Sequence, residues 1–598
     1  MLLDDGRLRL ADGRWVVTGE LDELRLPPSL QALLSARLDE LPAMERLLLG
    51  RAAVMRSQFP VSALAALSPE VPDREVVHAT LLALARKELL RPGHIMADLL
   101  PGTDRFTFRH TLLRDVAYQS VPKETRAELH KRYAGWIEQQ VPARPADIAE
   151  IVGYHLEAAY RHQVELGRLD EATNDLARQA GEWLALAGHN AVVPGDIPAV
   201  AVNYLKRAVE LLPDEHSGRT DALLDLADAL RGAGDLNRSL RTFEAATWAA
   251  SATGDARRHA HAVLGKVDLL WFSDPRALHD GGRAEVERAI QVLEQANDEL
   301  GLAKALRLMA YVHFGAGRTV EARATAERAI NIARAVSDER LQARIDRLHL
   351  LILFWGPVPI SGVMDAAEAS LAWAHQSGAR LLEASALNTL ARGHAMQGRL
   401  AEARQCNQDA SGIELEPGEL LTWAATVISE GLVELLAGEL DVAERTLRSG
   451  YREAHKARGV GMLGGLTVLL ARVLLLRGSD EEADAMAREC RRDASSSQLD
   501  VRLKSYSIRA VVLARWGRTA AATRLAEAVV RATECSGQPD TRAEVLADLA
   551  EVHERAGRSA AARVAAEEAV AIYGAKGNQS AASRVRALFA EPAGPAPV

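Results

Sequence analysis

Histidine and carboxylate side chains gather between residues 155 and 162. His155, Glu157 and His162 are all residue types that bind zinc in proteins. On a helix, positions i and i+7 share a face, which brings the two histidines together, but position i+2 points away from both. The chain contains no His-Glu-x-x-His motif. The pattern therefore favours a structural or surface role, and we predict no metal site.

A nucleotide-binding loop of the form Gly-x-x-x-x-Gly-Lys-Ser/Thr surrounds phosphates with backbone N–H groups. That motif is absent from the sequence. The nearest candidate, Gly574-Ala575-Lys576-Gly577, has the wrong spacing and follows the last copy of the repeat described below. No spacing of serine, histidine and aspartate indicates a catalytic triad. We therefore predict no catalytic residue, no cofactor and no enzyme activity in this chain.

The cysteines Cys406, Cys490 and Cys535 lie far apart and match neither a disulfide framework nor a zinc-binding spacing. This pattern is typical of a reducing compartment. The first residues carry charges and lack the apolar stretch of a signal peptide. The longest apolar run, 348–355, is far shorter than the about 20 residues that cross a membrane. We expect a cytoplasmic protein.

The composition favours closely packed helices. Hydrophobic residues make up 48% of the 598 residues but aromatic residues only 4%, and alanine and leucine dominate. A chain of this length exceeds one hydrophobic core, so we expect several domains or an array. The net charge of −9 argues against a general nucleic-acid binder.

A glycine recurs about every 40 residues along the last two thirds of the chain. A small residue precedes each copy by seven positions, and another follows by five, for example Ala310 and Ala322 around Gly317. Two gaps of 83 and 81 residues each leave room for one degenerate copy. A fixed period of this length indicates a solenoid. The glycines are Gly234, Gly317, Gly398, Gly438, Gly478, Gly517 and Gly557.

This repeat frame predicts helix–turn–helix units. The glycine ends the first helix in the left-handed conformation, and the small residues let the paired helices approach closely. We predict an all-α fold, with an α-solenoid of about nine or ten helix pairs over residues 141–590 and a disordered tail at 591–598. The period is interrupted near 272–282 and 355–362, where we expect extended loops between helices.

The first 140 residues follow a different pattern. Residues 1–45 read as a connector, with a hairpin around Asp12-Gly13 and a helix that begins after Ser29. Residues 46–140 read as a winged-helix-like domain, with helices near 43–55, 61–67, 73–88 and 110–140 and two short strands within 89–110. The basic residues of this domain leave DNA binding open as an alternative, and they are Arg105, Arg109, Arg114, Arg126, Lys131 and Arg132.

The array resembles the tetratricopeptide repeat in a long variant, because the fixed offsets around the glycine match that repeat. Its usual period is about 34 residues, whereas HEAT and armadillo repeats run to about 40–47, so these stay as alternatives.

Two strings in the first part of the chain carry a second resemblance. LPPSLQALLSARLDELPAMERLLLGRAAV and RFTFRHTLLRDVAYQSVPKETRAELHKRYAGWIE resemble the segment that follows the ATPase core of AAA/STAND-type signalling NTPases. These NTPases accompany class III adenylate/guanylate cyclases in actinobacteria. The resemblance implies a cyclase, an NTPase, a winged-helix-like segment and a tetratricopeptide array in that order. The nucleotide-binding core is absent here, so none of its catalytic residues can be assigned to a position in this chain.

The resemblance implies a regulatory protein of signal transduction that works with an NTPase or cyclase, in cis or in trans. One alternative is a fragment of a full-length adenylate/guanylate cyclase. Another is a fragment of an ATP-dependent transcriptional regulator of the LuxR type, although such regulators end in a helix-turn-helix that this chain lacks. We expect no membrane partner and no nucleic-acid partner.

The concave face of the array is the predicted binding surface, and a mixed arginine and aromatic lining suits a protein or an acidic peptide. In tetratricopeptide arrays this face is lined by first-helix residues six and three before the glycine, and one turn earlier. The predicted partner-binding residues are Arg307, Tyr311, Phe314, Asn388, Arg392, Arg472 and Glu551.

Overall fold

The computed structural model divides the chain into two compact units, Met1–Ala222 and Leu223–Val598. The sequence analysis placed the start of the array at residue 141, whereas the first unit extends 82 residues beyond position 140. The domain boundaries within each unit stay a prediction. The structure describes residues 8–11, 14–17, 28–55, 58–71, 73–93, 104–141, 145–192, 198–273, 281–413, 420–456, 460–493, 498–534 and 536–589.

Unit 1 opens with the predicted hairpin and helix. Strands β1 (Leu8–Ala11) and β2 (Arg14–Val17) pair antiparallel, with Leu8 opposite Val17, and helix α1 covers Pro28–Asp39. The hairpin prediction is confirmed, although the Asp12-Gly13 turn itself lies outside the described residues. The predicted helix is present, but it begins at Pro28, so Ser29 lies within it and does not precede it.

A small helical domain with a three-stranded sheet follows. Its elements are α2 (Ala43–Val54), β3 (Gln58–Pro60), α3 (Val61–Ala66), α4 (Arg74–Arg86), β4 (Leu90–Pro92) and β5 (Arg105–Phe108). The sheet order is β3-β5-β4, and both pairs are antiparallel. The predicted strand pair is confirmed, and the structure adds β3. The winged-helix assignment stays a prediction.

The prediction of one helix over 110–140 was wrong in one respect, because the segment forms two helices, α5 (Thr111–Ser120) and α6 (Lys123–Gln140). The break falls at Val121, whose backbone is extended at φ −78° and ψ 130°. Pro122 follows it, and a proline disfavours helical backbone in the residue before it. The remaining helices of unit 1 are α7 (Pro145–Glu165), α8 (Glu171–Ala191), α9 (Pro198–Leu211) and the start of α10 (Ser217–Gly232).

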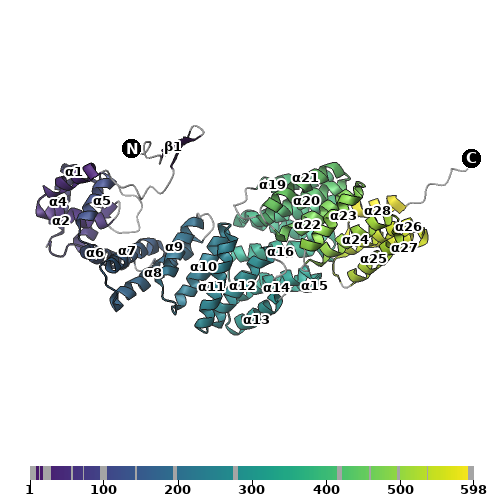
Figure 1. The fold of residues 1–598 in the computed structure, drawn as a ribbon, viewed down its shortest axis with the longest axis horizontal. Helices are drawn as coiled ribbons and strands as arrows, with labels where there is room; N and C mark the ends of the chain where they lie inside the picture. The colour runs from purple at the N-terminus through teal and green to yellow at the C-terminus, as the bar shows by residue number, and fades with distance from the viewer. Residues whose placement is uncertain are drawn as a thin grey trace, which may run out of the picture. The chain divides into compact units, whose positions relative to one another are not determined.

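Unit 2 is an all-α solenoid of consecutive helix pairs (Figure 1). Nine pairs run from α10 to α27 in the described part of the chain, and α28 follows them. The first helices of the pairs after α10 are α12 (Ala256–Ser273), α14 (Glu299–Gly315), α16 (Glu339–Trp355), α18 (Arg380–Met396), α20 (Leu420–Ala437), α22 (Val460–Leu476), α24 (Leu499–Arg515) and α26 (Pro539–Arg555). The second helices are α11 (Leu236–Ala252), α13 (Gly282–Gln295), α15 (Thr319–Ala335), α17 (Ile360–Ser377), α19 (Leu400–Ser411), α21 (Leu440–Lys456), α23 (Asp480–Asp493), α25 (Thr519–Thr533) and α27 (Ser559–Lys576), and α28 spans Gln579–Phe589.

The repeat frame positions these helices as predicted. All seven repeat glycines have positive φ, from 72° at Gly557 to 83° at Gly438, which the missing Cβ makes possible. The small residues on either side are buried at the contact between paired helices, as at Ala310 and Ala322, which are 0% exposed. A bulkier side chain there would separate the two helices.

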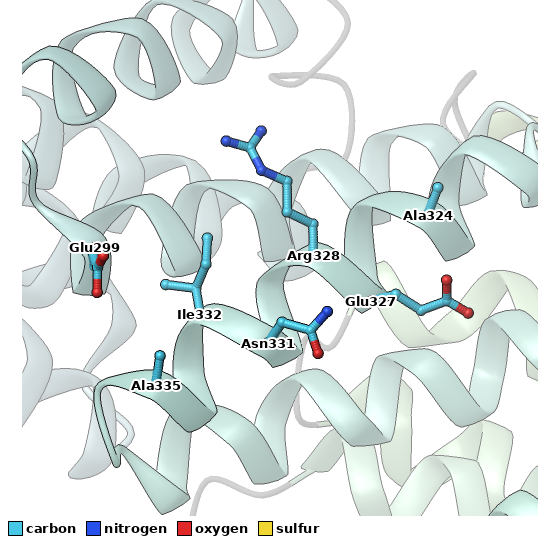
Figure 2. Close-up of a pocket in the computed structure, with 7 residues that line it drawn as sticks. All are labelled: Glu299, Ala324, Glu327, Arg328, Asn331, Ile332 and Ala335. Carbon is cyan, nitrogen blue, oxygen red and sulfur yellow. The ribbon is translucent and has the colours of Figure 1, made fainter.

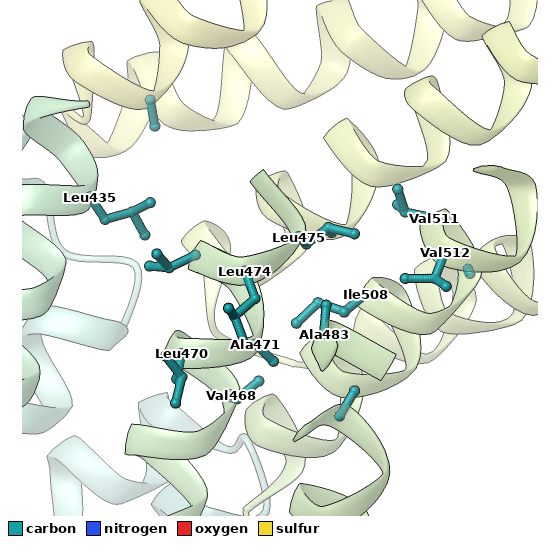
Figure 3. Close-up of a cluster of buried hydrophobic side chains, with 14 of the residues drawn as sticks. Leu435, Val468, Leu470, Ala471, Leu474, Leu475, Ala483, Ile508, Val511 and Val512 are labelled. Carbon is teal, nitrogen blue, oxygen red and sulfur yellow. The ribbon is translucent and has the colours of Figure 1, made fainter. Parts of the chain in front are cut away.

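The apolar core runs continuously from one pair into the next. Figure 3 shows this around α22, where Leu470 and Leu474 pack in one cluster with Ala483 of α23 and Ile508 and Val512 of α24. Each repeat therefore buries its apolar surface against its neighbours. None of the described helices combines the length and apolarity needed to span a membrane.

The two wide gaps in the glycine period hold the helix pairs α12/α13 and α16/α17, as predicted. The expected loop at 355–362 is short, because α16 ends at Trp355 and α17 begins at Ile360. Gly356 has φ −80° and ψ −176°, so this pair ends its first helix without a left-handed glycine. The expected loop near 272–282 lies largely outside the described residues.

Candidate partner-binding face

Polar residues on the first helices of successive pairs touch one another along unit 2. We call this surface the inner face and define it by Asp268, Arg307, Arg347, Asn388, Arg392, Arg472 and Asp548. It follows helices that contact each other in order, from α12 through α14, α16, α18, α20, α22 and α24 to α26. A repeat with fixed geometry places the first helices in a row, and all seven residues lie on first helices. Asp268 lies on α12 and Asp548 on α26, and the other five lie on α14, α16, α18 and α22.

The inner face begins with a carboxylate held by two arginines. Asp268 of α12 accepts from Arg231 Nη1 at 2.8 Å and pairs with Arg307 Nη2 of α14 at 2.8 Å. Burial by itself raises the pKa of Asp268, but the positive charges of Arg307, Arg231 and Arg344 lower it below its ordinary value. Asp268 is therefore ionised and links α10, α12 and α14.

The middle of the inner face uses neutral partners. Asn388 Nδ2 donates to Thr426 Oγ1 at 2.9 Å, and Arg392 Nε donates to the Asn388 backbone carbonyl at 3.0 Å. The Arg392 guanidinium lies 4.4 Å from the ring centroid of Phe354, a cation–π contact. Burial lowers the pKa of Arg392 to about 10.

Arg347 of α16 resembles Arg392 in its partners. Its Nε donates to Ser385 Oγ at 3.2 Å and its Nη2 donates to Thr422 Oγ1 at 2.9 Å. Within the described residues, neither Arg347 nor Arg392 forms an ion pair with a carboxylate. The middle of the inner face therefore carries two guanidinium groups that its own acids do not neutralise.

The last part of the inner face is acid-paired again. Arg472 of α22 donates to both carboxylate oxygens of Asp548 of α26, each at 2.7 Å, and its Nε lies 2.7 Å from Glu544 Oε1. Ser507 Oγ of α24 donates to Asp548 Oδ2 at 2.6 Å. Burial by itself lowers the pKa of Arg472, but Asp548 and Glu544 raise it, so the guanidinium stays charged.

The seven predicted partner-binding residues fall into two groups. Arg307, Asn388, Arg392 and Arg472 are buried in contacts within the chain. Tyr311, Phe314 and Glu551 are half-buried, and Glu551 pairs with Arg515 at 2.8 Å and with Arg555 at 3.0 Å. Their contact with a partner stays a prediction.

The sequence analysis missed the residues that partner these side chains, namely Asp268, Glu544, Asp548 and Thr426. A signal for them exists in the spacing. Arg231 and Asp268 are 37 residues apart, Asn388 and Thr426 are 38 apart, and Arg472 and Asp548 are 76 apart. These separations are close to one or two repeat periods, so a search for complementary polar residues at that period would have found them.

A hollow of about 510 Å³ is lined by residues of α15 and by Glu299 at the start of α14 (Figure 2). Its charged residues come with opposite signs, and Arg328 donates to Glu294 at 2.7 Å. The hollow therefore presents both signs of charge to a ligand. It is lined by Glu299, Ala324, Glu327, Arg328, Asn331, Ile332 and Ala335.

The histidines singled out in unit 1 take part in a buried hydrogen-bonded chain. Tyr118 Oη lies 2.8 Å from Nε2 of both His130 and His162, and His130 Nδ1 lies 2.7 Å from His155 Nδ1. Burial lowers the pKa of His130 to about 3, with His162 and Arg126 adding to the effect. This chain joins α5, α6 and α7.

Glu157 takes no part in these hydrogen bonds between Tyr118 and the histidines, and it pairs with Arg161 and Arg207. In the described part of the molecule, no group of three His, Cys, Asp or Glu side chains is placed to hold a metal ion.

No protein-family model matches the chain, and no curated protein matches it either. Among solved structures, it is similar to a Signal Transduction ATPase with Numerous Domains (STAND) protein with a tetratricopeptide repeat sensor from Pyrococcus horikoshii. The TM-score is 0.45 and the identity 13%, over 78% of this chain. The match spans 65% of the length of that STAND protein.

Two further solved structures are similar to the chain at 13% identity. One is the APC/C hetero-tetramer Cut9–Hcn1, with a TM-score of 0.47 over 79% of this chain and 90% of that chain. The other is aspartyl phosphate phosphatase F from Bacillus subtilis, with a TM-score of 0.31 over 65% of this chain and 89% of that chain.

Proposed function

We propose that this chain is a regulatory or scaffolding protein of signal transduction that binds an acidic protein segment or peptide through the inner face of unit 2. The observation that carries the proposal is the pair Arg347 and Arg392, two guanidinium groups with only neutral partners among the described residues. Guanidinium groups bind carboxylates through strong, often bidentate, charge-assisted hydrogen bonds.

Coupling to an NTPase or a cyclase is part of the same proposal. It is supported by the resemblance of the two strings between residues 26 and 138 to the segment after an ATPase core. In this view the chain is cytoplasmic and non-catalytic, and a binding event in the array is passed to an NTPase in cis or in trans. A fragment of a full-length cyclase remains the alternative.

Peptide binding tests the inner face. Fluorescent peptides rich in Asp and Glu, with neutral and basic peptides of equal length, are titrated with the purified chain and followed by anisotropy. We expect the acidic set to bind most tightly. The double variant Arg347→Gln/Arg392→Gln should weaken that binding about tenfold or more, because it removes both positive charges. A tenfold loss corresponds to about 1.4 kcal/mol of binding free energy.

Arg328→Gln, in the hollow lined by α15, is the matched control and should leave binding unchanged. Equal affinity for acidic and basic peptides, or equal loss in the control, contradicts the proposed site. ATP hydrolysis and cyclic-AMP formation by the purified chain are measured in parallel, and either activity contradicts the non-catalytic role.

A further inference from the structure

Turns that are about 220 residues apart in the sequence touch directly in unit 2. Gly537 N donates to the Gly317 carbonyl at 2.9 Å, and Thr319 Oγ1 donates to the Gly537 carbonyl at 2.8 Å. Ser580 Oγ donates to the Ala395 carbonyl at 2.7 Å, 185 residues away. The turns that follow α14 and α18 therefore lie against the turn before α26 and the start of α28. We call this set of contacts, together with Lys576, the clasp.

Lys576 makes three of the hydrogen bonds of the clasp. Its Nζ donates to the backbone carbonyls of Leu353, Gly356 and Val358 at 3.3, 2.7 and 2.7 Å. Leu353 lies in the last turn of α16, the helix that ends without a left-handed glycine, and Gly356 and Val358 lie in the short segment that follows it. The ammonium group thus satisfies acceptors that the terminus of a helix leaves unpaired. Burial lowers the pKa of Lys576 to about 8, and Asp540 acts in the opposite direction.

The fit between the turns is close enough to require glycine. A Cβ on Gly537 would overlap Thr319 Oγ1, and a Cβ on Gly577 would lie 2.7 Å from Ile360 Cγ2. By contrast, a Cβ on Gly574, in the neighbouring helix α27, would meet nothing within 4 Å. The contact at the clasp is therefore a specific one, made by backbone groups that side chains would hold apart.

The clasp brings first helices together across the array. α12 contacts α22, and α28 contacts both α18 and α20. Lys504 Nζ of α24 lies 4.5 Å from the ring centroid of Trp355 of α16. Arg392 is only 7% exposed, and its guanidinium contacts Phe354 of α16 and Asn388 and Thr389 of α18, so little of it meets solvent in this arrangement.

The chemistry of the clasp differs from that of the core between neighbouring repeats. The repeats share apolar side chains such as Leu470 and Ile508, whose exposure to water is costly. The hydrogen bonds of the clasp end on backbone carbonyls, and water can replace each partner when the turns separate. These hydrogen bonds therefore cost less to break than the apolar contacts between neighbouring repeats.

We propose that the clasp is a gate, and that the inner face becomes accessible to a partner only when the clasp opens. This inference rests on the proposed function for the identity of the partner, but opening itself can be measured without one. Gly537→Ala should open the clasp because its new methyl group collides with Thr319. Thr319→Ala in the same chain should largely restore closure, because it removes the hydroxyl that is hit.

Thiol labelling measures access directly. In a chain whose three native cysteines are replaced by alanine, Thr426→Cys places a thiol at a buried position on the inner face. We expect Gly537→Ala to speed its labelling about tenfold, since the rate follows the open population. Gly537→Ala/Thr319→Ala should return close to the parent rate, and Gly574→Ala should match the parent. Circular dichroism verifies that each variant is folded. If Gly537→Ala is unfolded, the milder variant Ser580→Ala is used in its place to open the clasp.

Equal labelling of Gly537→Ala, or of Ser580→Ala in its place, and Gly574→Ala overturns the gate. Acidic-peptide titration of the same variants then separates the two proposals. Faster labelling with tighter peptide binding supports both. Faster labelling with no peptide bound by any variant overturns the proposed function and leaves the gate standing. Faster labelling with binding equal to that of the parent overturns the gate as a control of access.

Discussion

Arg392 and Arg472 occupy the same position of the repeat, six residues before the glycine, yet they have opposite surroundings. Both are buried, at 7% and 6% exposure. Arg472 is clamped by two carboxylates, whereas Arg392 has a backbone carbonyl, a threonine hydroxyl and an aromatic ring. The comparison shows that one repeat position serves two purposes. At α22 it fixes the packing of three helix pairs. At α18 it holds a charge without a carboxylate partner among the described residues, and we propose that this charge meets a ligand.

The largest effect is expected at the acid-paired site. Asp548→Ala removes the carboxylate that Arg472 grips with two hydrogen bonds and leaves a buried charge with one acid partner, Glu544. Breaking a buried ion pair from one side costs about 3–5 kcal/mol. Urea unfolding followed by circular dichroism should show that loss in the free energy of unfolding. A loss below about 1 kcal/mol would mean that the two arginines are equivalent after all.

A pH dependence is expected where an arginine has an acid partner and not where it has none. The folded-state pKa of Asp268 lies below its ordinary value, so its contribution is present above about pH 4 and is lost as pH falls through the folded pKa. At pH 7 we expect Asp268→Asn to cost about 1–3 kcal/mol. That cost should shrink toward pH 3, whereas the cost of Arg392→Met should not change with pH over this range. A pH-independent cost for Asp268→Asn would contradict the assignment.

A smaller effect is expected at the neutral site. Arg392→Met removes a buried charge that has no carboxylate partner and replaces it with an apolar side chain of similar length. Such a replacement in a packed interior changes stability by less than about 1.5 kcal/mol. Thermal or urea unfolding gives the value, and the same variant should lose acidic-peptide binding. A loss as large as that of Asp548→Ala would assign Arg392 to the framework of the fold.

The smallest effect sets the baseline for the comparison. Arg328 pairs with Glu294 on the surface, where both side chains are about half exposed. Arg328→Gln should therefore change the free energy of unfolding by less than about 0.5 kcal/mol, because exposed ion pairs contribute little. A larger change, measured by the same urea titration, would show that the pair of Arg328 and Glu294 is part of the framework of the fold.

Local chemistry explains why the predictions of the helical frame are confirmed. A glycine with positive φ at Gly317, small residues at Ala310 and Ala322, and amphipathic helices between them act over one or two turns of chain. Pro122 is the instructive exception. The apolar spacing across it predicted one helix, but the backbone restriction that the proline places on Val121 divides it in two.

Four residues of the inner face could be chosen from their place in the frame, but not their surroundings, and these are Arg307, Asn388, Arg392 and Arg472. Whether Arg392 or Arg472 meets an acid depends on residues one or two repeats away, and Asp548 lies 76 residues from Arg472. Each repeat contributes one side of such a contact, so the frame within one copy carries no information about the other side.

The sequence by itself determined the all-α repeat architecture, the turn of each helix pair and the candidate face, because these follow from periodicity and from the conformations that glycine and proline allow. Only the tertiary structure decided which turns meet in the clasp. Lys576, which the sequence offered as part of a failed phosphate loop, caps the end of α16 from 220 residues away at Gly356. That contact depends on the small rotation each repeat adds to the last, a sum over many helices that no local pattern records.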